Sequence, residues 1–136
     1  MPRIVALDVG DATIGVAATD ELGLIAHPVK TIRRTKSIKA DLRTVEELLA
    51  ELDAEKVVVG LPLLGSGEEG TQAAKVRDFF DRLARRLRIP AELWDESLST
   101  VEAESLLLDA DVSRAKRRKV IDQLAAVVIL RGYLGI

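Results

Sequence analysis

Two periodicities of apolar and polar positions divide the chain into predicted strands and helices. Residues 3–10 (RIVALDVG) and 13–20 (TIGVAATD) are short runs rich in β-branched residues, and a brief Gly-Asp-Ala turn separates them. This spacing predicts a β-hairpin. Residues 24–33 (LIAHPVKTIR) fit a third strand. Pro28 within that run predicts a sheet edge or a bulge, because proline has no amide hydrogen to donate to a neighbouring strand.

The rest of the chain alternates between helices and strands. The run 56–63 (KVVVGLPL) predicts a buried parallel strand, and 91–96 (AELWDE) predicts a last strand. Apolar residues at helical spacing predict helices over 38–52 and 72–88. Two more helices are predicted, one starting at the capping box Ser99–Glu102 and one running from Ser113 to about Tyr133.

This order of elements predicts an α/β fold. Three opening strands followed by alternating helices and strands imply a mixed five-stranded sheet flanked by helices on both faces, which is the ribonuclease H-like order. The length of 136 residues is that of one ordinary domain, so we expect residues 1–136 to form a single ribonuclease H-like domain.

Composition narrows the class of protein. The chain is 48% hydrophobic and 31% charged, which is typical of a globular protein and excludes a disordered one. It has no cysteine, which excludes disulfides and thiolate metal sites and suits a reducing interior. No apolar run is long enough to span a bilayer. We therefore expect a cytoplasmic protein without a membrane partner.

Positive charge gathers in one segment, although the net charge is only −2. Residues 114–119 (RAKRRK) carry five cations in six positions, namely Arg114, Lys116, Arg117, Arg118 and Lys119. A basic stripe on a near-neutral domain can bind nucleic acid by its phosphates. A solvated helix face explains the same charges equally well, so charge alone leaves both readings open.

Acidic residues stand near the ends of two predicted strands. Asp8 comes near the end of the first strand, and Asp95 and Glu96 end the last one. Ligands of α/β sheets sit beyond the carboxyl ends of the parallel strands. We expect these two strands to be able to lie as neighbours, which would bring their carboxylates together. Each acid alone could equally be a turn former or precede a helix cap.

A third acid, Asp122, interrupts the apolar helix pattern VIDQLAAVVIL. Burying an unpaired charge is costly, unless the residue points to solvent at the edge of the apolar face. Ala125 and Ala126 follow on the same helical face, and their small side chains would let the helix approach the sheet closely. Three carboxylates around one point would form a hard-oxygen site for Mg²⁺ or Mn²⁺, of the kind that hydrolyses phosphodiesters.

Four segments carry a resemblance to a known family: LDVGDATIGVA, VVVGLPL, WDESLSTVEAE and VSRAKRRKVIDQLAAVVILRGYL. In order and over nearly the whole chain, they resemble the YqgF/RuvX family, described as Holliday-junction resolvase-like nucleases and as pre-16S rRNA processing nucleases. The resemblance implies a ribonuclease H-like fold, a cytoplasmic bacterial protein and a metal-dependent nuclease. It implies an acidic triad of Asp8, Glu96 and Asp122, with Asp95 as the alternative to Glu96.

The chain departs from the family pattern in three loops. Gly10, Asp11 and Ala12 follow the first strand where the family usually has Gly-Thr and a basic residue, and Ser97 replaces the usual arginine after the Asp-Glu pair. Leu64 replaces a common asparagine, and Glu68 stands near a usual threonine. Two cations are lost and two acids gained, which weakens phosphate binding.

The resemblance leaves the substrate open. On its own it favours processing of pre-16S rRNA on a ribosomal precursor particle over cutting of branched or single-stranded DNA. Junction cutting would require two active sites and hence a homodimer, and no dimer seam is readable in the sequence. A second reading is a nucleic-acid-binding module with weak catalysis, motivated by the lost cations. A third, an actin-like sugar kinase or ATPase, requires two such domains, which 136 residues cannot supply.

Overall fold

The five strands found in the described part of the chain match the predicted ones closely. The computed structural model describes residues 3–20, 22–23, 25–64, 66–95 and 114–136, and for residues 114–123 it describes the backbone alone. The strands are β1 (Arg3–Val9), β2 (Thr13–Thr19), β3 (Ala26–Arg33), β4 (Ala54–Leu61) and β5 (Ala91–Asp95). They form one sheet in the order β3-β2-β1-β4-β5.

The first three strands form an antiparallel meander at one side of this sheet. β1 pairs with β2 and β2 with β3, so the predicted hairpin is confirmed. The prediction from Pro28 is confirmed as well: β3 is an edge strand, and its pairing with β2 shifts register beside Pro28. β4 and β5 run parallel to β1, which makes the sheet mixed.

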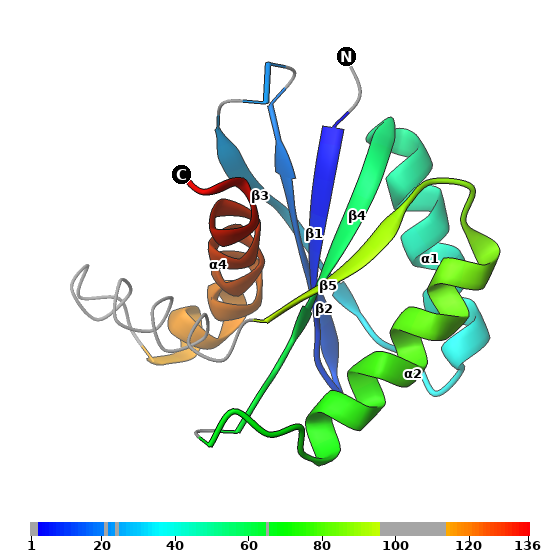
Figure 1. Ribbon diagram of the computed structural model, residues 1–136, viewed down its shortest axis with the longest axis vertical. Helices are drawn as coiled ribbons and strands as arrows, with labels where there is room; N and C mark the ends of the chain where they lie inside the picture. The colour runs from blue at the N-terminus through cyan, green and yellow to red at the C-terminus, as the bar shows by residue number, and fades with distance from the viewer. Residues whose placement is uncertain (1–2, 21, 24, 65, 96–113) are drawn as a thin grey trace.

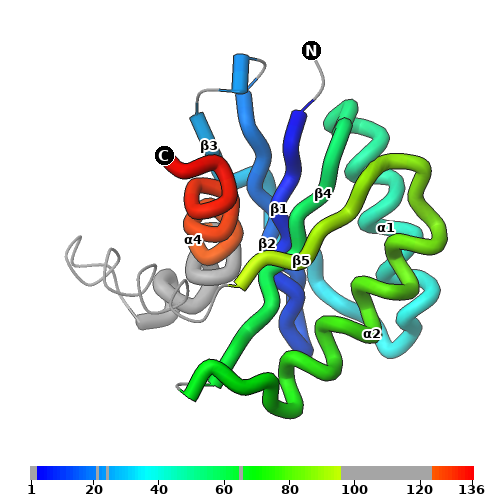
Figure 2. The backbone as a smooth tube through the Cα atoms, viewed as in Figure 1, coloured from blue at the N-terminus to red at the C-terminus, as the bar shows by residue number. Residues whose placement is uncertain are grey.

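Helices cover both faces of the sheet (Figure 1). Helices α1 (Ile38–Glu51) and α2 (Thr71–Arg86) lie on one face, and α4 (Arg114–Leu134) crosses the other. The tube view shows the same two layers, with the chain's C-terminus at the end of the sheet where β1 begins (Figure 2). Helix α4 therefore runs against the direction of β1, and its first turns lie toward the carboxyl end of that strand.

Side chains of β1 alternate between two separate hydrophobic clusters. Val5, Leu7 and Val9 belong to the large cluster under α1 and α2, whereas Ala6 belongs to a smaller one under α4. This alternation follows from the two-residue period of a strand. The small cluster is closed from the helix side by Ala126, Ile129 and Leu130, all at most 1% exposed.

The predicted helices are confirmed over the described residues, with small differences at their ends. In α1 the side chains of Leu42, Val45 and Leu49 are buried as the spacing requires, while Ile38 at the first turn stays 38% exposed. Ser37 caps this helix by accepting a hydrogen bond from the amide of Ala40. The helix predicted from Ser99 and the cap predicted at Ser113 lie outside the described residues.

Candidate active site

Asp8 lies on the sheet face that α4 covers. It is the penultimate residue of β1 and is half-buried. Its neighbour two residues back, Ala6, packs in the small cluster under α4, so strand alternation directs Asp8 to the same face. The predicted position of Asp8 near the end of the first strand is therefore confirmed, and that strand is the central one of the sheet.

Glycine flanks Asp8 on both neighbouring strands. Gly15 of β2 is its direct partner, and Gly60 of β4 is level with it because Leu7 pairs with Val59. Both glycines are buried. Neither adds a side chain beside the carboxylate, so only backbone atoms flank Asp8 on the two neighbouring strands.

The two strands that carry the predicted acids are not neighbours. β4 lies between β1 and β5, so the expectation that the first and last strands pair directly is wrong. The physical reason is that β4 is more apolar than β5. Val57, Val58 and Val59 are all 0% exposed, as a strand between two parallel neighbours requires. Adjacent strands are about 4.8 Å apart, which puts the backbones of β1 and β5 roughly 10 Å apart.

Asp95 lies on the opposite face of the sheet from Asp8. Its pairing partner Leu61 and its neighbour Leu93 both pack in the large cluster under α1 and α2. The pKa of Arg77, on α2, is raised first by its hydrogen bond to Glu69 and further by the negative charges of Asp81 and Asp95. The structure thus brings Asp95 toward α2 and not toward Asp8. Glu96, the other acid of this pair, lies outside the described residues.

Residue 122 is part of helix α4, although only its backbone is described. It precedes Ala126 by one turn and Ile129 by two, and both of these residues are buried against the sheet. The predicted burial of Ala125 and Ala126 is confirmed, since both are 0% exposed. The backbone at 122 therefore continues the sheet-facing row of α4 toward the carboxyl end of β1.

The basic segment forms the first turns of the same helix. Arg114, Lys116, Arg117, Arg118 and Lys119 all belong to α4, as the pattern predicted, and their side chains lie outside the described part of the structure. Among the side chains that are described, no three acids or histidines gather closely enough to hold a metal ion. Of the predicted ligands, only Asp8 and Asp95 are in that set.

The turn after β1 is held by an arginine that the sequence analysis did not single out. Arg34 donates from its guanidinium to the carbonyl of Gly10 at 2.8 Å, and its backbone amide donates to the carbonyl of Ala12 at 2.8 Å. The same guanidinium donates through Nε to Asp41 at 3.1 Å and lies 5.1 Å from the centre of the Phe79 ring. Arg34 therefore connects the turn beside Asp8 to both α1 and α2.

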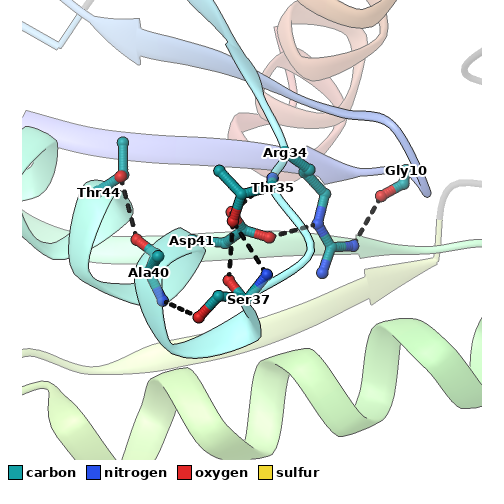
Figure 3. A network of polar contacts seen from close by, with 7 residues as sticks. All are labelled: Gly10, Arg34, Thr35, Ser37, Ala40, Asp41 and Thr44. Atoms are coloured by element: carbon teal, nitrogen blue, oxygen red, sulfur yellow. Dashed lines mark hydrogen bonds and ion pairs between the residues drawn. The ribbon is translucent and has the colours of Figure 1, made fainter.

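Asp41 is the buried anchor of this network (Figure 3). Its carboxylate also accepts hydrogen bonds of 2.9 Å from the amide and the hydroxyl of Thr35, and the residue is 1% exposed. Burial alone would raise the pKa of Asp41, but the hydrogen bonds from Thr35 and Arg34 outweigh it and lower the pKa. The only sequence signal for this role was an acid in the first turn of an amphipathic helix.

A second cation reaches the same turn from α2. The ammonium of Lys75 lies 3.3 Å from the carboxylate of Asp11, with both side chains exposed. Arg34 and Lys75 both reach this turn, and each is paired with an acid. The turn itself is tight, since a Cβ on Gly10 would come within 3.1 Å of the Thr13 carbonyl oxygen.

Comparison with known proteins decides the family. The family model described as RuvX, Holliday junction resolvase, matches residues 2–135. The chain belongs to the RuvX family. A relative from Myxococcus xanthus, named as a candidate pre-16S rRNA nuclease, is 53% identical over 132 residues, which cover 97% of this chain and 87% of the relative. Both names describe nucleases, so this is a family of hydrolases that cleave phosphodiester bonds.

Solved structures confirm the ribonuclease H-like fold. RuvC of Thermus thermophilus, in complex with a Holliday junction substrate, superimposes with a TM-score of 0.58 at 14% identity, covering 99% of this chain and 97% of RuvC. The fowlpox virus Holliday junction resolvase gives a TM-score of 0.59 at 11% identity and covers 98% of each chain. At such low identity these likenesses establish the fold of the RuvX chain alone.

Proposed function

We propose that this RuvX-family chain is a divalent-metal-dependent nuclease that processes the 5′ end of pre-16S rRNA. The observation that carries the proposal is the place of Asp8, between two buried glycines on the sheet face that α4 covers. The names of the relatives, at about half identity over nearly the full length, support the choice of rRNA over other nucleic acids.

The proposed metal ligands are Asp8, Glu96 and Asp122, for Mg²⁺ or Mn²⁺. Carboxylate oxygens are the hard donors that these ions prefer, and neither Gly15 nor Gly60 places a side chain beside Asp8. Asp95 faces α2, which favours Glu96 as the ligand from that pair. When bound, such ions activate a water and stabilise the leaving oxygen.

The basic first turns of α4 are proposed to hold the nucleic-acid backbone. Residues 114–119 precede position 122 on the same helix, so cations there would stand along the path of a strand that enters the acidic site. Contacts of this kind fix position without reading sequence. The partner would then be a ribosomal precursor particle in the bacterial cytoplasm.

No helix in the described ranges has the length and apolarity needed to cross a membrane.

A cleavage panel tests the proposal. Wild-type protein with Mn²⁺ is expected to cut an RNA that spans the 5′ end of pre-16S rRNA, and Asp8→Asn is expected to reduce the rate at least about 100-fold, because a ligand to the ions is lost. Glu96→Gln is expected to act like Asp8→Asn, whereas the matched neighbour Asp95→Asn is expected to retain the rate. Full activity of Asp8→Asn, with contaminating nuclease excluded, would overturn the proposal.

Thermal stability gives a readout that is independent of cleavage. A ligand that binds only the folded state raises its stability in proportion to RT ln(1 + [L]/Kd). Mn²⁺ is therefore expected to raise the Tm of the wild type and of Asp95→Asn, and to leave the Tm of Asp8→Asn unchanged. Equal stabilisation of all three proteins would place the ion somewhere other than at Asp8.

Junction resolution is the second candidate, and the description of the matching family model favours it. Resolving a junction requires two active sites and hence a symmetric dimer. Sedimentation and a cleavage assay with branched DNA together distinguish the two candidates. A dimer that cuts the junction in paired nicks favours this candidate, and a monomer active on rRNA excludes it. Salt-dependent binding of either substrate without turnover would instead show a binding module, as the loss of cations at Ala12 and Ser97 suggests.

A further inference from the structure

The chain's single tryptophan and single tyrosine contact each other on the sheet face that α4 covers. Trp94 of β5 and Tyr133 of α4 meet edge to face, with ring centroids 5.6 Å apart. Tyr133 is held in turn by Lys56, which donates to its hydroxyl and forms an ion pair of 2.9 Å with Glu92. One side of the indole is thereby fixed, yet Trp94 remains 38% exposed.

Trp94 stands in the same row across the sheet as Asp8. It pairs with Gly60, and Gly60 is level with Asp8 on the other side. All three belong to the α4 face: Trp94 contacts α4 through Tyr133, and a Cβ on Gly132 of that helix would lie 3.3 Å from the indole nitrogen. Two strand spacings separate the backbones of Trp94 and Asp8, roughly 10 Å, with only a glycine between them.

Exposure of one apolar side chain is ordinary, so the position of Trp94 is what matters. Leu22, at 71% exposed, lies at the opposite end of the strands, in the turn between β2 and β3. The backbone of Trp94 instead lies two strands from that of Asp8, and its ring is anchored on one side by the last turns of α4. An aromatic ring in a fixed orientation offers a stacking face to a nucleobase, and single-stranded nucleic acid is commonly bound by such rings.

We propose that Trp94 is a stacking platform for an unpaired base of the substrate, on the same sheet face as Asp8 and toward the last turns of α4. The proposal rests on the proposed function, because it assumes that nucleic acid lies across this face of the sheet. It assigns a binding residue to a single-stranded segment of RNA or DNA and excludes a fully paired duplex at this position, since a paired base does not expose a face.

Fluorescence of the sole tryptophan tests the proposal directly. A short oligouridylate, added to the wild type without divalent metal, is expected to quench the emission saturably, while inorganic polyphosphate and a fully paired RNA are expected to leave it unchanged. The control is Leu22→Trp in a Trp94→Phe background, which moves the only tryptophan to the far end of the sheet and is expected to show no quenching. Oligouridylate that binds without quenching Trp94, or polyphosphate that quenches it equally, would overturn the proposal.

Variants of Trp94 separate stacking from packing. Trp94→Ala is expected to weaken binding of the oligouridylate about 5- to 150-fold, the range for loss of one stacked base, while Trp94→Phe retains most of the affinity. Polyphosphate binding is expected to be the same for all three proteins. If Trp94→Ala does not fold, Trp94→Leu replaces it and Tm is measured for each. A loss of Tm with unchanged affinity would assign Trp94 to packing alone.

Failure of this inference is distinguishable from failure of the proposed function. The titrations contain no metal, so they do not depend on cleavage. Quenching by oligouridylate in a protein that cuts no substrate would uphold the stacking role and overturn the nuclease proposal. If Trp94→Ala cleaves at the rate and with the KM of the wild type, the nuclease proposal stands and the stacking role is overturned.

Discussion

At the scale of single residues, the turn that follows Asp8 depends on a charge pair from elsewhere in the chain. Arg34 joins Gly10 to Asp41, and Asp41 is almost fully buried. A buried carboxylate is tolerated only when its lone pairs are satisfied, and here three hydrogen bonds do so. The position of the loop beside the proposed metal site therefore rests on residues that would touch neither metal nor substrate.

Arg34→Ala is expected to destabilise the fold by about 2–3 kcal/mol, because it leaves Asp41 buried without its cation and frees the Gly10 carbonyl. Urea unfolding at neutral pH measures this change. The matched control is Lys75→Ala, which removes an exposed ion pair at the same turn and is expected to cost less than about 1 kcal/mol. Equal effects of the two substitutions would show that burial of Asp41 is not what matters.

At the scale of elements, α4 contributes to both the core and the proposed site. Ala126 shares one hydrophobic cluster with Ala6 and Ala17, so small side chains on both elements let the helix lie close to the sheet. One turn earlier the same helix carries position 122. A change in that packing would therefore shift position 122, so the proposed metal site is expected to depend on this apolar contact.

Ala126→Leu is expected to cost about 1–3 kcal/mol by overpacking and to lower the Mn²⁺-dependent cleavage rate more than Tm alone would explain. Thermal unfolding and cleavage at a temperature well below Tm measure the two effects separately. Arg131→Ala, at an exposed position of the same helix, is expected to change stability by no more than about 0.5 kcal/mol and to leave the cleavage rate unchanged. Normal cleavage by a destabilised Ala126→Leu protein would contradict the link.

At the scale of the whole molecule, the sequence predicts the strands and helices more accurately than it predicts which of them are neighbours. The five strands follow from local β-branched runs, and Pro28 marked the edge strand. The separation of β1 from β5 by β4 was not predicted, because apolar periodicity carries no information on strand order. The face of Asp95 was readable in principle, since Ala91 and Leu93 precede it at two-residue spacing and share its face. The Arg34–Gly10 contact was not, because 24 residues separate the partners.

Acid stability of the whole molecule is expected to depend on Asp41. Its pKa in the folded protein lies below the ordinary value of 3.8, so its contribution is present above that value and is lost as the pH falls through the lowered pKa. Asp41→Asn is therefore expected to be less stable than the wild type at neutral pH and to approach it as the pH falls below about 4. Denaturant unfolding across that range measures the convergence, and a constant difference between the two proteins would contradict it.

The proline and the register shift in β3 limit how copies of this chain can assemble. An edge strand with regular spacing invites another chain to extend the sheet, and both features interrupt that template. Proline also withholds one amide hydrogen from the rim. A symmetric pair of molecules is thus expected to avoid a continuous sheet through β3 and to meet through helices or loops. The same two features of β3 would then protect the chain against aggregation and also restrict the dimer geometry open to a two-site enzyme.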